Sequence, residues 1–579
     1  MTALLLSRLR PHAGSLALLC LLQVAAVGGT LWLPALNARL IDDGVAQGEV
    51  ATVWSLGSQM LGVGLAQLLA AALAMVLGAR VAAQVAATLR YEVFERVMHL
   101  DAAQVRAVGA GSLLTRCGND VLQLQMLVLT CCTVLLTVPL TMTGAIVLGL
   151  REDPGLAWLM AVAVPAVALV LGLFAWWAVP GYRRMQGQID DVNLVLREQL
   201  TGLRVVRAFT RERHEQRRFE RANDALVDTS FGVGRLYLSL GPVVALLMNA
   251  GGVAVVWFGG MRVSAGEIGI GSVTAFIAYL LQLMSSVLMA SAIVMQLPRA
   301  RVSAGRVREL LDLPPGAGSV RGARTAPVPG RSRDGLRMEG VELRHPGSPG
   351  AVLEHVDLHL PPGSHTVLLG STGSGKTALL QALAAQLTPT RGRVLLEGVD
   401  LAEADPALAR RRVLLVPQRA HLFGGSVADN LRYGAPDASD DELWEALRAA
   451  HADDVVAGLG GLDATLPPGG LTLSGGQRQR LCLARALLAR PDHYLVDDAL
   501  SALDARTEAA VREALLAWAA SHGAGVVTAT QRLAGVERAD RVVVLDRGAV
   551  VGLGTHDELA GTCRAYDELL DADHEGALA

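Results

Sequence analysis

A glycine-rich segment in the second half of the chain has the residue types and spacing needed to hold phosphate groups. It reads Gly370-Ser-Thr-Gly-Ser-Gly-Lys-Thr377 and follows Thr366 to Leu369, an apolar run typical of a buried strand. Glycines let successive backbone N–H groups turn toward phosphate oxygens at the start of a helix. In this pattern the Lys376 ammonium reaches the β- and γ-phosphates, and the Thr377 hydroxyl is a ligand for Mg²⁺. The segment therefore predicts a site for a nucleoside triphosphate and Mg²⁺.

The choice of lysine within this segment supports the same interpretation. Lys376 is the only lysine in the chain, and every other basic residue among the 51 is arginine. An ammonium is a compact charge on a flexible stem, whereas a guanidinium is a wider planar group. We infer that this position requires the smaller cation.

Four further segments give the site a specific resemblance. Leu473-Ser-Gly-Gly-Gln477 resembles the signature motif of ATP-binding cassette (ABC) proteins, and His493 to Asp498 resembles their Walker B strand. Gln418 is similar to the glutamine of the Q-loop, and Ser501 to Asp504 is similar to the D-loop. The order and spacing of these motifs resemble the family from Met338 to Leu570. The segment Gly202 to Phe209 resembles the second cytoplasmic loop of six-helix exporters, and Gly111 to Val121 resembles the first.

This resemblance implies a role for each matching residue. In the family, the signature holds the γ-phosphate of a nucleotide bound to the opposite subunit. It implies that ATP is bound by His345, Gly370, Ser371, Thr372, Gly373, Ser374, Gly375, Lys376, Thr377, Ser474, Gly475, Gly476, Gln477 and Asp504. It also implies catalytic roles for Gln418, Asp498 and Gln531, and a Mg²⁺ site formed by Thr377, Gln418 and Asp497.

Four positions depart from the family pattern. Asp498 stands where the family has the glutamate that polarises the attacking water, and Gln531 stands where it has a histidine. Losing one methylene withdraws a carboxylate by about 1 Å, which can cost about 10²-fold in rate. Glutamine can hydrogen-bond to a phosphate but cannot carry a proton. His345 replaces the aromatic residue that stacks on adenine, and Pro468 replaces an acidic residue upstream of the signature.

Together these departures imply a degenerate site that binds ATP and hydrolyses it slowly or not at all. The expected protein is a multidrug-exporter-like half-transporter that works with a second, competent half as a heterodimer. A slow homodimer is the alternative within the same family. Two others are an ATP-gated regulatory membrane protein that does not pump, and an importer with the exporter fold.

The elements that must position this site begin with a long apolar region. Hydrophobic residues form 52% of the chain and its mean hydropathy is +0.39. Six windows lack Asp, Glu, Lys and Arg, and each exceeds the roughly 20 residues that cross a bilayer. They are Pro11 to Ala38, Val50 to Ala79, Val121 to Leu150, Pro154 to Tyr182, Leu236 to Met261 and Ile268 to Pro298. The sequence predicts six membrane helices and excludes a soluble ATPase.

Basic residues predict the orientation of these helices. The connection Gly181 to Arg235 carries eleven arginines, and Arg80 to Asp120 carries several more. Because basic loops stay in the cytoplasm, both long connections and both termini are expected there, in a multi-pass protein of the cell membrane. If each connection folds as two helical extensions of about 20 residues, it projects about 30 Å from the membrane. Tips are expected near Ala107 to Leu113 and Arg204 to Arg211.

The second half of the chain has a different composition. Leu313 to Gly335 is rich in Pro, Gly and Arg and is expected to be a linker. Beyond it, short β-rich runs alternate with helical stretches, which predicts an α/β domain with a largely parallel sheet. The runs are Arg393 to Leu396, Arg412 to Val416, Tyr494 to Val496 and Arg541 to Leu545. The expected domains are a transmembrane domain at 1–312, a linker at 313–335 and a nucleotide-binding domain at 336–579.

The remaining composition narrows the partners. A net charge of −3 gives no sign of a nucleic-acid partner, and the spacing of the six cysteines suggests neither a disulfide framework nor a metal site. The expected partners are a second half-transporter, membrane lipid and a transported substrate. Polar residues are few in the apolar windows, which fits an amphipathic or lipid-like cargo but equally fits helix packing.

Overall fold

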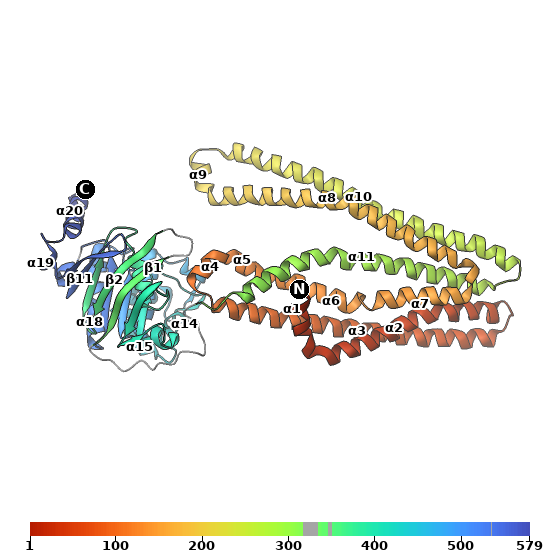
Figure 1. Cartoon of the computed structure of the whole chain (residues 1–579), viewed down its shortest axis with the longest axis horizontal. Helices are drawn as coiled ribbons and strands as arrows, with labels where there is room; N and C mark the ends of the chain where they lie inside the picture. Colours follow the sequence, from red (N-terminus) through yellow and green to blue (C-terminus); the bar gives the residue numbers. More distant parts are fainter. Residues whose placement is uncertain (317–333, 345–349, 534, 579) are drawn as a thin grey trace. The chain divides into compact units, whose positions relative to one another are not determined.

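A computed structural model of the chain describes residues 1–316, 334–344, 350–533 and 535–578. These residues divide into two units (Figure 1). The helical unit comprises Met1–Phe94 and Leu114–Asp312. The sheet unit comprises Glu95–Leu113 and Leu313–Ala579.

The helical unit consists of long helices joined by short turns, and the prediction of six membrane helices is confirmed. Six segments are long and apolar enough to cross a membrane: Leu4–Val45, Val50–Met98, Ala110–Glu152, Pro154–Thr201, Glu212–Ser264 and Ile270–Ala290. The helices are α1 (Thr2–Leu9), α2 (Ala13–Arg39), α3 (Val50–Met98), α6 (Val121–Val134), α7 (Thr137–Glu152), α8 (Ala157–Thr201), α9 (Leu203–Ala208), α10 (Glu212–Ser264) and α11 (Ile270–Asp312). The boundary with the sheet unit falls within the short helix α5 (Ala110–Thr115). Two π-helical turns, η2 (Leu40–Val45) and η3 (Arg116–Asp120), interrupt this pattern.

Helix α11 packs against α2, α6, α7, α8 and α10 and forms the core of the helical unit. Phe276, Tyr279, Leu280 and Leu283 of α11 are fully buried. The Tyr279 hydroxyl donates a hydrogen bond to the carbonyl of Leu31 in α2, at 3.1 Å. A polar tip that finds a backbone acceptor can be buried between helices without an unpaired group.

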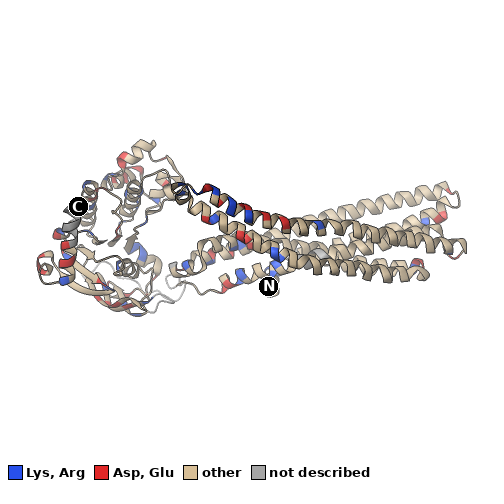
Figure 2. Ribbon diagram, turned by 90° about the horizontal axis from the view of Figure 1, so that it is seen from above, with Lys and Arg blue, Asp and Glu red and all other residues tan. Residues whose placement is uncertain are grey.

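The predicted helical extensions are also present. Helices α8 and α10 continue well past their apolar parts, and the short helix α9 joins them. Figure 2 shows charged residues gathered on these extensions and largely absent from the remaining length of the helices. The first tip differs from the expectation: α3 ends at Met98, and α4 (Ala102–Val108) follows it.

The sheet unit contains two main sheets. A six-stranded sheet has the order β12-β11-β3-β10-β9-β6, and all neighbours are parallel except β11 and β12. Its strands are β3 (His365–Leu369), β6 (Val413–Val416), β9 (His493–Asp497), β10 (Gly525–Thr530), β11 (Arg541–Asp546) and β12 (Ala549–Gly554). The predicted largely parallel α/β fold is therefore confirmed.

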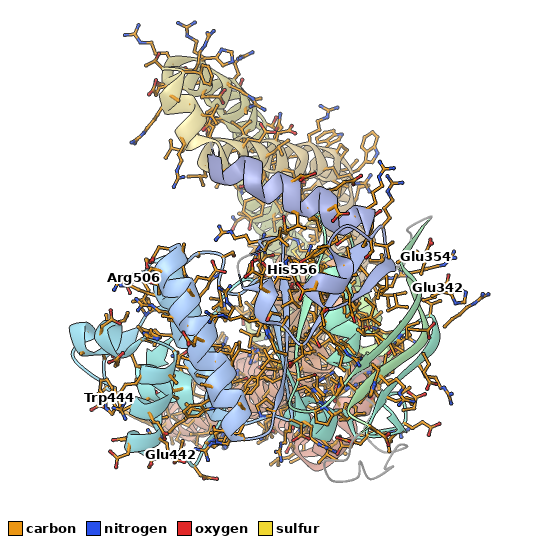
Figure 3. All side chains as sticks on the ribbon, turned by 90° about the vertical axis from the view of Figure 1, so that its left-hand side faces the viewer. Glu342, Glu354, Glu442, Trp444, Arg506 and His556 are labelled. Atoms are coloured by element: carbon orange, nitrogen blue, oxygen red, sulfur yellow. The ribbon has the colours of Figure 1, made fainter. Side chains whose placement is uncertain are left out.

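A second, antiparallel sheet was not predicted. It has the order β2-β1-β4-β5, formed by β1 (Leu336–Arg344), β2 (Ala351–Leu360), β4 (Arg391–Leu396) and β5 (Val399–Asp400). The β-rich run Arg393 to Leu396, expected in the parallel sheet, lies in this second sheet as part of β4. A two-stranded ribbon pairs β7 (Gly425–Ser426) with β8 (Thr465–Leu466). Figure 3 looks onto this unit, with Glu342 and Glu354 marking β1 and β2.

The helices of the sheet unit cover these strands and carry the motifs. They are α4, α12 (Lys376–Leu383), α13 (Pro406–Arg412), α14 (Val427–Arg432), α15 (Asp440–Ala449), α16 (Asp453–Leu459), α17 (Gly475–Leu488), α18 (Ala505–Ser521), α19 (His556–Leu559) and α20 (Arg564–Leu578). Helices α14, α15, α17 and α18 share one apolar core with β6, β9 and β10. Helix α12 packs into a second core with β1, β2 and β4.

Most of the expected linker, residues 317–333, lies outside the described residues. Its beginning bonds to the segment that precedes α4. The Gly316 N–H donates to the His99 carbonyl at 2.9 Å, and the Arg96 guanidinium donates to the Leu313 carbonyl at 3.0 Å. These bonds help to explain why Glu95–Leu113 groups with the sheet unit and not with the predicted domain 1–312.

Candidate functional site

Four neighbouring parallel strands end at the same edge of the central sheet and bring the motif residues together. Strand β3 ends at Leu369, directly before Gly370, and β9 ends at Asp497. Strand β10 ends at Thr530, directly before Gln531, and β6 ends two residues before Gln418. Ligands bind at the carboxyl edge of parallel strands because the following loops converge there. The strand order thus assembles segments that lie up to 161 positions apart in the sequence.

The glycine-rich loop has the backbone conformation that phosphate binding requires. Gly375, directly before α12, has φ +105°, and a Cβ there would lie 2.9 Å from the Val352 carbonyl oxygen. Only glycine adopts this conformation without strain. Lys376 is buried, and its ammonium donates to the carbonyls of Gly370 at 2.7 Å and Ser371 at 2.9 Å. The ammonium is thus held against the loop whose N–H groups would receive phosphate.

Burial and two nearby carboxylates have opposite effects on the pKa of Lys376. Burial lowers the pKa of Lys376, while Asp498 and Asp497 act to raise it. Burial also raises the pKa of Asp497, against the hydrogen bond from Thr377, which lowers it. A buried carboxylate whose charge is poorly compensated is a suitable neighbour for a cation.

Thr377 and Asp497 fit a Mg²⁺ ion. The Thr377 hydroxyl donates to Asp497 Oδ1 at 3.1 Å, so both oxygens already point to one place. Mg²⁺ prefers oxygen ligands and commonly takes one or two from the protein, with the rest from phosphate and water. Among the described residues, no group of three or more His, Cys, Asp or Glu side chains could hold a metal by itself. The donors present therefore match a cation that arrives with a nucleotide.

The residue after the Walker B strand is tied to the Q-loop. The Gln418 side-chain amide donates to Asp498 Oδ2 at 3.0 Å. Asp498 has φ +45°, and its N–H bonds to the carbonyl of Ala529 at 3.0 Å. This left-handed conformation disfavours most side chains, and aspartate is one of the few that tolerate it. Backbone and side chain together fix the position of this carboxylate.

Gln531 contacts the glycine-rich loop from the neighbouring strand. Thr372 donates from its hydroxyl to Gln531 Oε1 at 3.2 Å. The loop, Gln418, both aspartates and Gln531 line one cavity of about 930 Å³. Arg106 of α4 also lines this cavity and was not predicted, because no motif at the tip of the first long connection singles it out.

The signature is well formed but lies elsewhere. Ser474 caps α17, its hydroxyl accepting from the Gln477 N–H at 3.3 Å while its own N–H donates to Gln477 Oε1 at 2.9 Å. A Cβ on Gly476 would meet the Ala502 carbonyl oxygen at 3.1 Å, so the signature packs closely on the D-loop. Among the described residues that line the phosphate cavity, none belongs to the signature.

Of the two other predicted nucleotide contacts, one is not described by the structure and the other does not line the cavity. His345 lies outside the described residues. Asp504 caps α18 by accepting from the Thr507 N–H at 3.0 Å, and these bonds lower its pKa. The structure therefore brings together the glycine-rich loop, the Walker B aspartates, Gln418 and Gln531, and it separates them from Ser474 to Gln477 and Asp504.

Comparison with known families matches both halves of the chain. Residues 16–287 match the ABC transporter transmembrane region, and residues 353–501 match the ABC transporter domain. The chain is 41% identical over 573 residues to an uncharacterized ABC transporter ATP-binding protein of Mycobacterium tuberculosis, covering 98% of this chain and 97% of that protein.

Two further similarities extend over nearly the whole chain. An ATP-dependent lipid A-core flippase of Chromohalobacter salexigens is 30% identical over 573 residues, covering 98% of this chain and 96% of the flippase. A solved structure of a bacterial Atm1-family ABC exporter with ATP bound has the same fold, with a TM-score of 0.79 and 22% identity. That similarity covers 97% of this chain and 99% of the other.

Proposed function

Because this chain belongs to the ABC transporters of the exporter type, as a half-transporter with one ATPase domain, we propose that it is the degenerate-site subunit of a heterodimer. In this proposal its own phosphate cavity binds Mg-ATP with little hydrolysis, and its signature completes the competent site of a second subunit. The observation that carries the proposal is the pair of residues at the reacting end of the cavity, Asp498 and Gln531.

Neither residue is suited to activate water. The Asp498 carboxylate is one methylene shorter than glutamate, and the Gln418 amide already occupies one of its oxygens. A carboxylate oxygen held in such a bond is less free to approach a water molecule. Gln531 can accept or donate a hydrogen bond but has no titrating group that could carry a proton. Both effects slow hydrolysis without weakening phosphate binding.

The binding half of the site has all its groups. Lys376 and the N–H groups of the glycine-rich loop neutralise and hold phosphate oxygens. Thr377 and Asp497 would hold Mg²⁺, whose positive charge neutralises phosphate oxygens when it is bound. These residues account for nucleotide retention in a site with slow turnover.

The position of the signature supports a second subunit. Ser474 is exposed at the start of α17, where backbone N–H groups and the helix dipole favour an anion. It lies outside this chain's own phosphate cavity, so its N–H groups are available to a phosphate held by another chain. A nucleotide in each of two such sites would lie between the subunits.

The substrate is proposed to be amphipathic or lipid-like. The helical unit exposes many large apolar side chains, and one relative of similar length is a lipid A-core flippase. The arginine-rich connection Gly181 to Arg235 supports an orientation in the cell membrane that places the sheet unit on the cytoplasmic side.

The direct test is to produce this chain alone and to measure Mg-ATP binding and ATPase activity in detergent or lipid. We expect binding that Lys376→Ala removes, with little turnover. Co-purification from the native membrane should then recover a second half-transporter that carries glutamate after its Walker B aspartate.

Other outcomes would favour the alternatives. Vigorous ATPase activity of the isolated chain, abolished by Lys376→Ala, would contradict the heterodimer and support a homodimer. Mg-ATP binding without turnover and without any partner half would support an ATP-gated regulatory membrane protein. Uptake of substrate into cells that carry the complex would support an importer.

A further inference from the structure

Glu508 connects two segments of the sheet unit. One is the start of α18, which follows the D-loop, and the other contains Gln531, which lines the nucleotide cavity, and Arg532. Its carboxylate pairs with Arg512 one turn along α18, at 3.4 Å, and with Arg532, at 3.1 Å. The Glu508 side chain is 12% exposed, so it is held in place, whereas the Arg532 side chain is 54% exposed. The less exposed carboxylate is thus the fixed member of the pair, and the arginine is the member that it restrains.

The position of Glu508 follows from the start of α18. Asp504, the last residue of the D-loop, caps this helix, and Glu508 lies in its first turn. Figure 3 labels Arg506 in the same turn. An acidic side chain is stabilised there by the helix dipole. Glu508 therefore moves with the beginning of α18 and with the end of the D-loop.

Arg532 lies directly after Gln531, in a segment with few other restraints. The Arg532 N–H donates to the Thr530 hydroxyl at 3.0 Å, and Gln531 is bonded to Thr372 at 3.2 Å. Arg512 lies against the backbone of Gly535, where a Cβ would be 2.8 Å from its guanidinium carbon. Between Thr530 and Gly535, the ion pair with Glu508 is the charged contact that anchors the described part of this segment to a helix.

These side chains also enclose a small space behind the catalytic carboxylate. Glu508, Arg512 and Arg532 line a cavity of about 30 Å³ together with His365 and Asp498. A cavity of this size holds about one water molecule and leaves little room for the segment to shift inward.

We propose that Glu508 is a positioning residue for this transporter's nucleotide site: it holds Arg532, and through it Gln531, against the end of the bound nucleotide that carries the γ-phosphate. This proposal rests on the proposed role of Gln531, and it adds Glu508 as the residue that holds the Gln531 side chain in position. It also assigns Glu508 as the contact through which a displacement of the D-loop alters nucleotide binding in the same subunit.

The test compares ATP with ADP, because only ATP has the phosphate that Gln531 would reach. Affinities of the full-length chain for Mg-ATP and Mg-ADP are measured by competition against a fluorescent nucleotide. We expect Glu508→Gln to weaken Mg-ATP binding about two- to fivefold, the range for a partly exposed ion pair, and to leave Mg-ADP binding unchanged. Arg532→Gln should do the same, and the double variant should lose no more than either single variant.

Two controls separate positioning from folding. Arg532→Lys keeps the charge and should restore most of the preference for ATP. Thermal unfolding of each variant reports whether the sheet unit is intact. A loss of thermal stability with an unchanged ATP-to-ADP ratio, or additive effects in the double variant, would overturn the inference.

Gln531→Ala distinguishes failure of this inference from failure of the proposed function. If Gln531→Ala lowers the ATP-to-ADP ratio and Glu508→Gln does not, Gln531 keeps its assignment and Glu508 loses its positioning role. If neither variant changes the ratio, both assignments are overturned.

Discussion

In the proposed function, the carboxylate after the Walker B strand limits hydrolysis in this chain's own cavity. Asp498 has a left-handed backbone, an N–H bonded to Ala529 and a side chain bonded to Gln418. Each restraint holds the short carboxylate close to the sheet. A longer side chain in the same backbone position would extend about one methylene farther into the cavity. A displacement of that size can change the rate of the reaction by about 10²-fold.

Restoring the longer carboxylate should therefore recover only part of the activity. Asp498→Glu in the chain produced alone should raise ATP turnover by at most about tenfold, because Gln531 still cannot carry a proton. Adding Gln531→His should raise it by about 10²-fold over the unmodified chain. Single-turnover ATPase assays at saturating Mg-ATP measure both changes.

The matched control is Asp498→Asn, which keeps the length and should leave turnover at its low level. Full recovery by Asp498→Glu alone would mean that Gln531 does not limit the reaction.

At this scale the sequence predicts residue types better than contacts. The glycine-rich loop, Asp497 and Gln531 were identified because each is part of a short motif. The bond from Gln418 to Asp498 spans 80 positions and depends on β6 lying beside β9 in the sheet. No local pattern encodes that neighbourhood, and the same reason explains why Arg106 and Glu508 were missed.

Among the elements, α17 has a start that serves two purposes. Ser474 caps the helix through the capping box with Gln477, and its exposed position is the one proposed to meet the partner's phosphate. Replacing Ser474 by a large residue would disturb both. The two purposes can be separated because aspartate caps helices as well as serine does.

Ser474→Asp should keep the stability of the sheet unit and remove the activity of the complex. Its negative charge would oppose the γ-phosphate and lower kcat by at least about 10²-fold. Ser474→Ala should instead lower the stability by about 1 kcal/mol through the lost cap. Thermal unfolding and ATPase assays on the same preparations check both effects. Equal activity of the aspartate variant and the unmodified complex would contradict a phosphate contact at this position.

Within the helical unit, the turn η3 is joined to α11 by a buried hydrogen bond and by an ion pair with an exposed glutamate. The Ser303 hydroxyl donates to Asp120 Oδ1 at 2.8 Å, and both residues are at most 5% exposed. Arg116 pairs with Glu309 at 2.9 Å one turn away. A π-helical turn is often retained for a function, and here it carries the first of the two exporter-like connection motifs.

Ser303→Ala should destabilise the helical unit by about 1–3 kcal/mol, because it leaves the buried Asp120 carboxylate without its donor. Ser286→Ala is the control on the same helix, since that buried hydroxyl donates to the Gln282 carbonyl of α11 itself. Thermal unfolding in detergent should show a clear drop for the first and little change for the second. A similar shift for both variants would mean that the bond to Asp120 adds no stability.

The elements themselves were largely predictable. The six membrane helices and the strands β3, β6, β9 and β11 coincide with apolar or β-rich runs that the sequence shows directly, whereas β10 was not predicted. The antiparallel sheet was missed, because β1 and β2 mix buried apolar residues with exposed charged ones and contain irregular registers. The tip of the second long connection lies where it was expected, at α9, whereas the first lies several residues earlier than expected. The first could not be placed more closely because no apolar pattern marks where a polar helix turns.

Over the whole molecule, the signature lies apart from the cavity that contains both the intact phosphate-binding loop and the two altered residues, Asp498 and Gln531. Phosphate binding, the signature and its helix are complete, while the two residues at the reacting end of the cavity depart from the family. A subunit with this combination can support hydrolysis in another chain and contribute little in its own cavity. In the proposed heterodimer, we therefore expect the two nucleotide sites to differ in activity.

One measurement tests this asymmetry most directly: kcat for ATP hydrolysis by the reconstituted heterodimer with one substitution at a time in this chain, and with nucleotide binding checked separately. Ser474→Arg should lower kcat by about 10²–10³-fold, because it removes phosphate contacts that act in the transition state. Asp498→Asn should leave kcat within about a factor of two, since the short carboxylate already contributes little. Equal losses, or a larger loss from Asp498→Asn, would show that this chain's own site is the one that hydrolyses ATP.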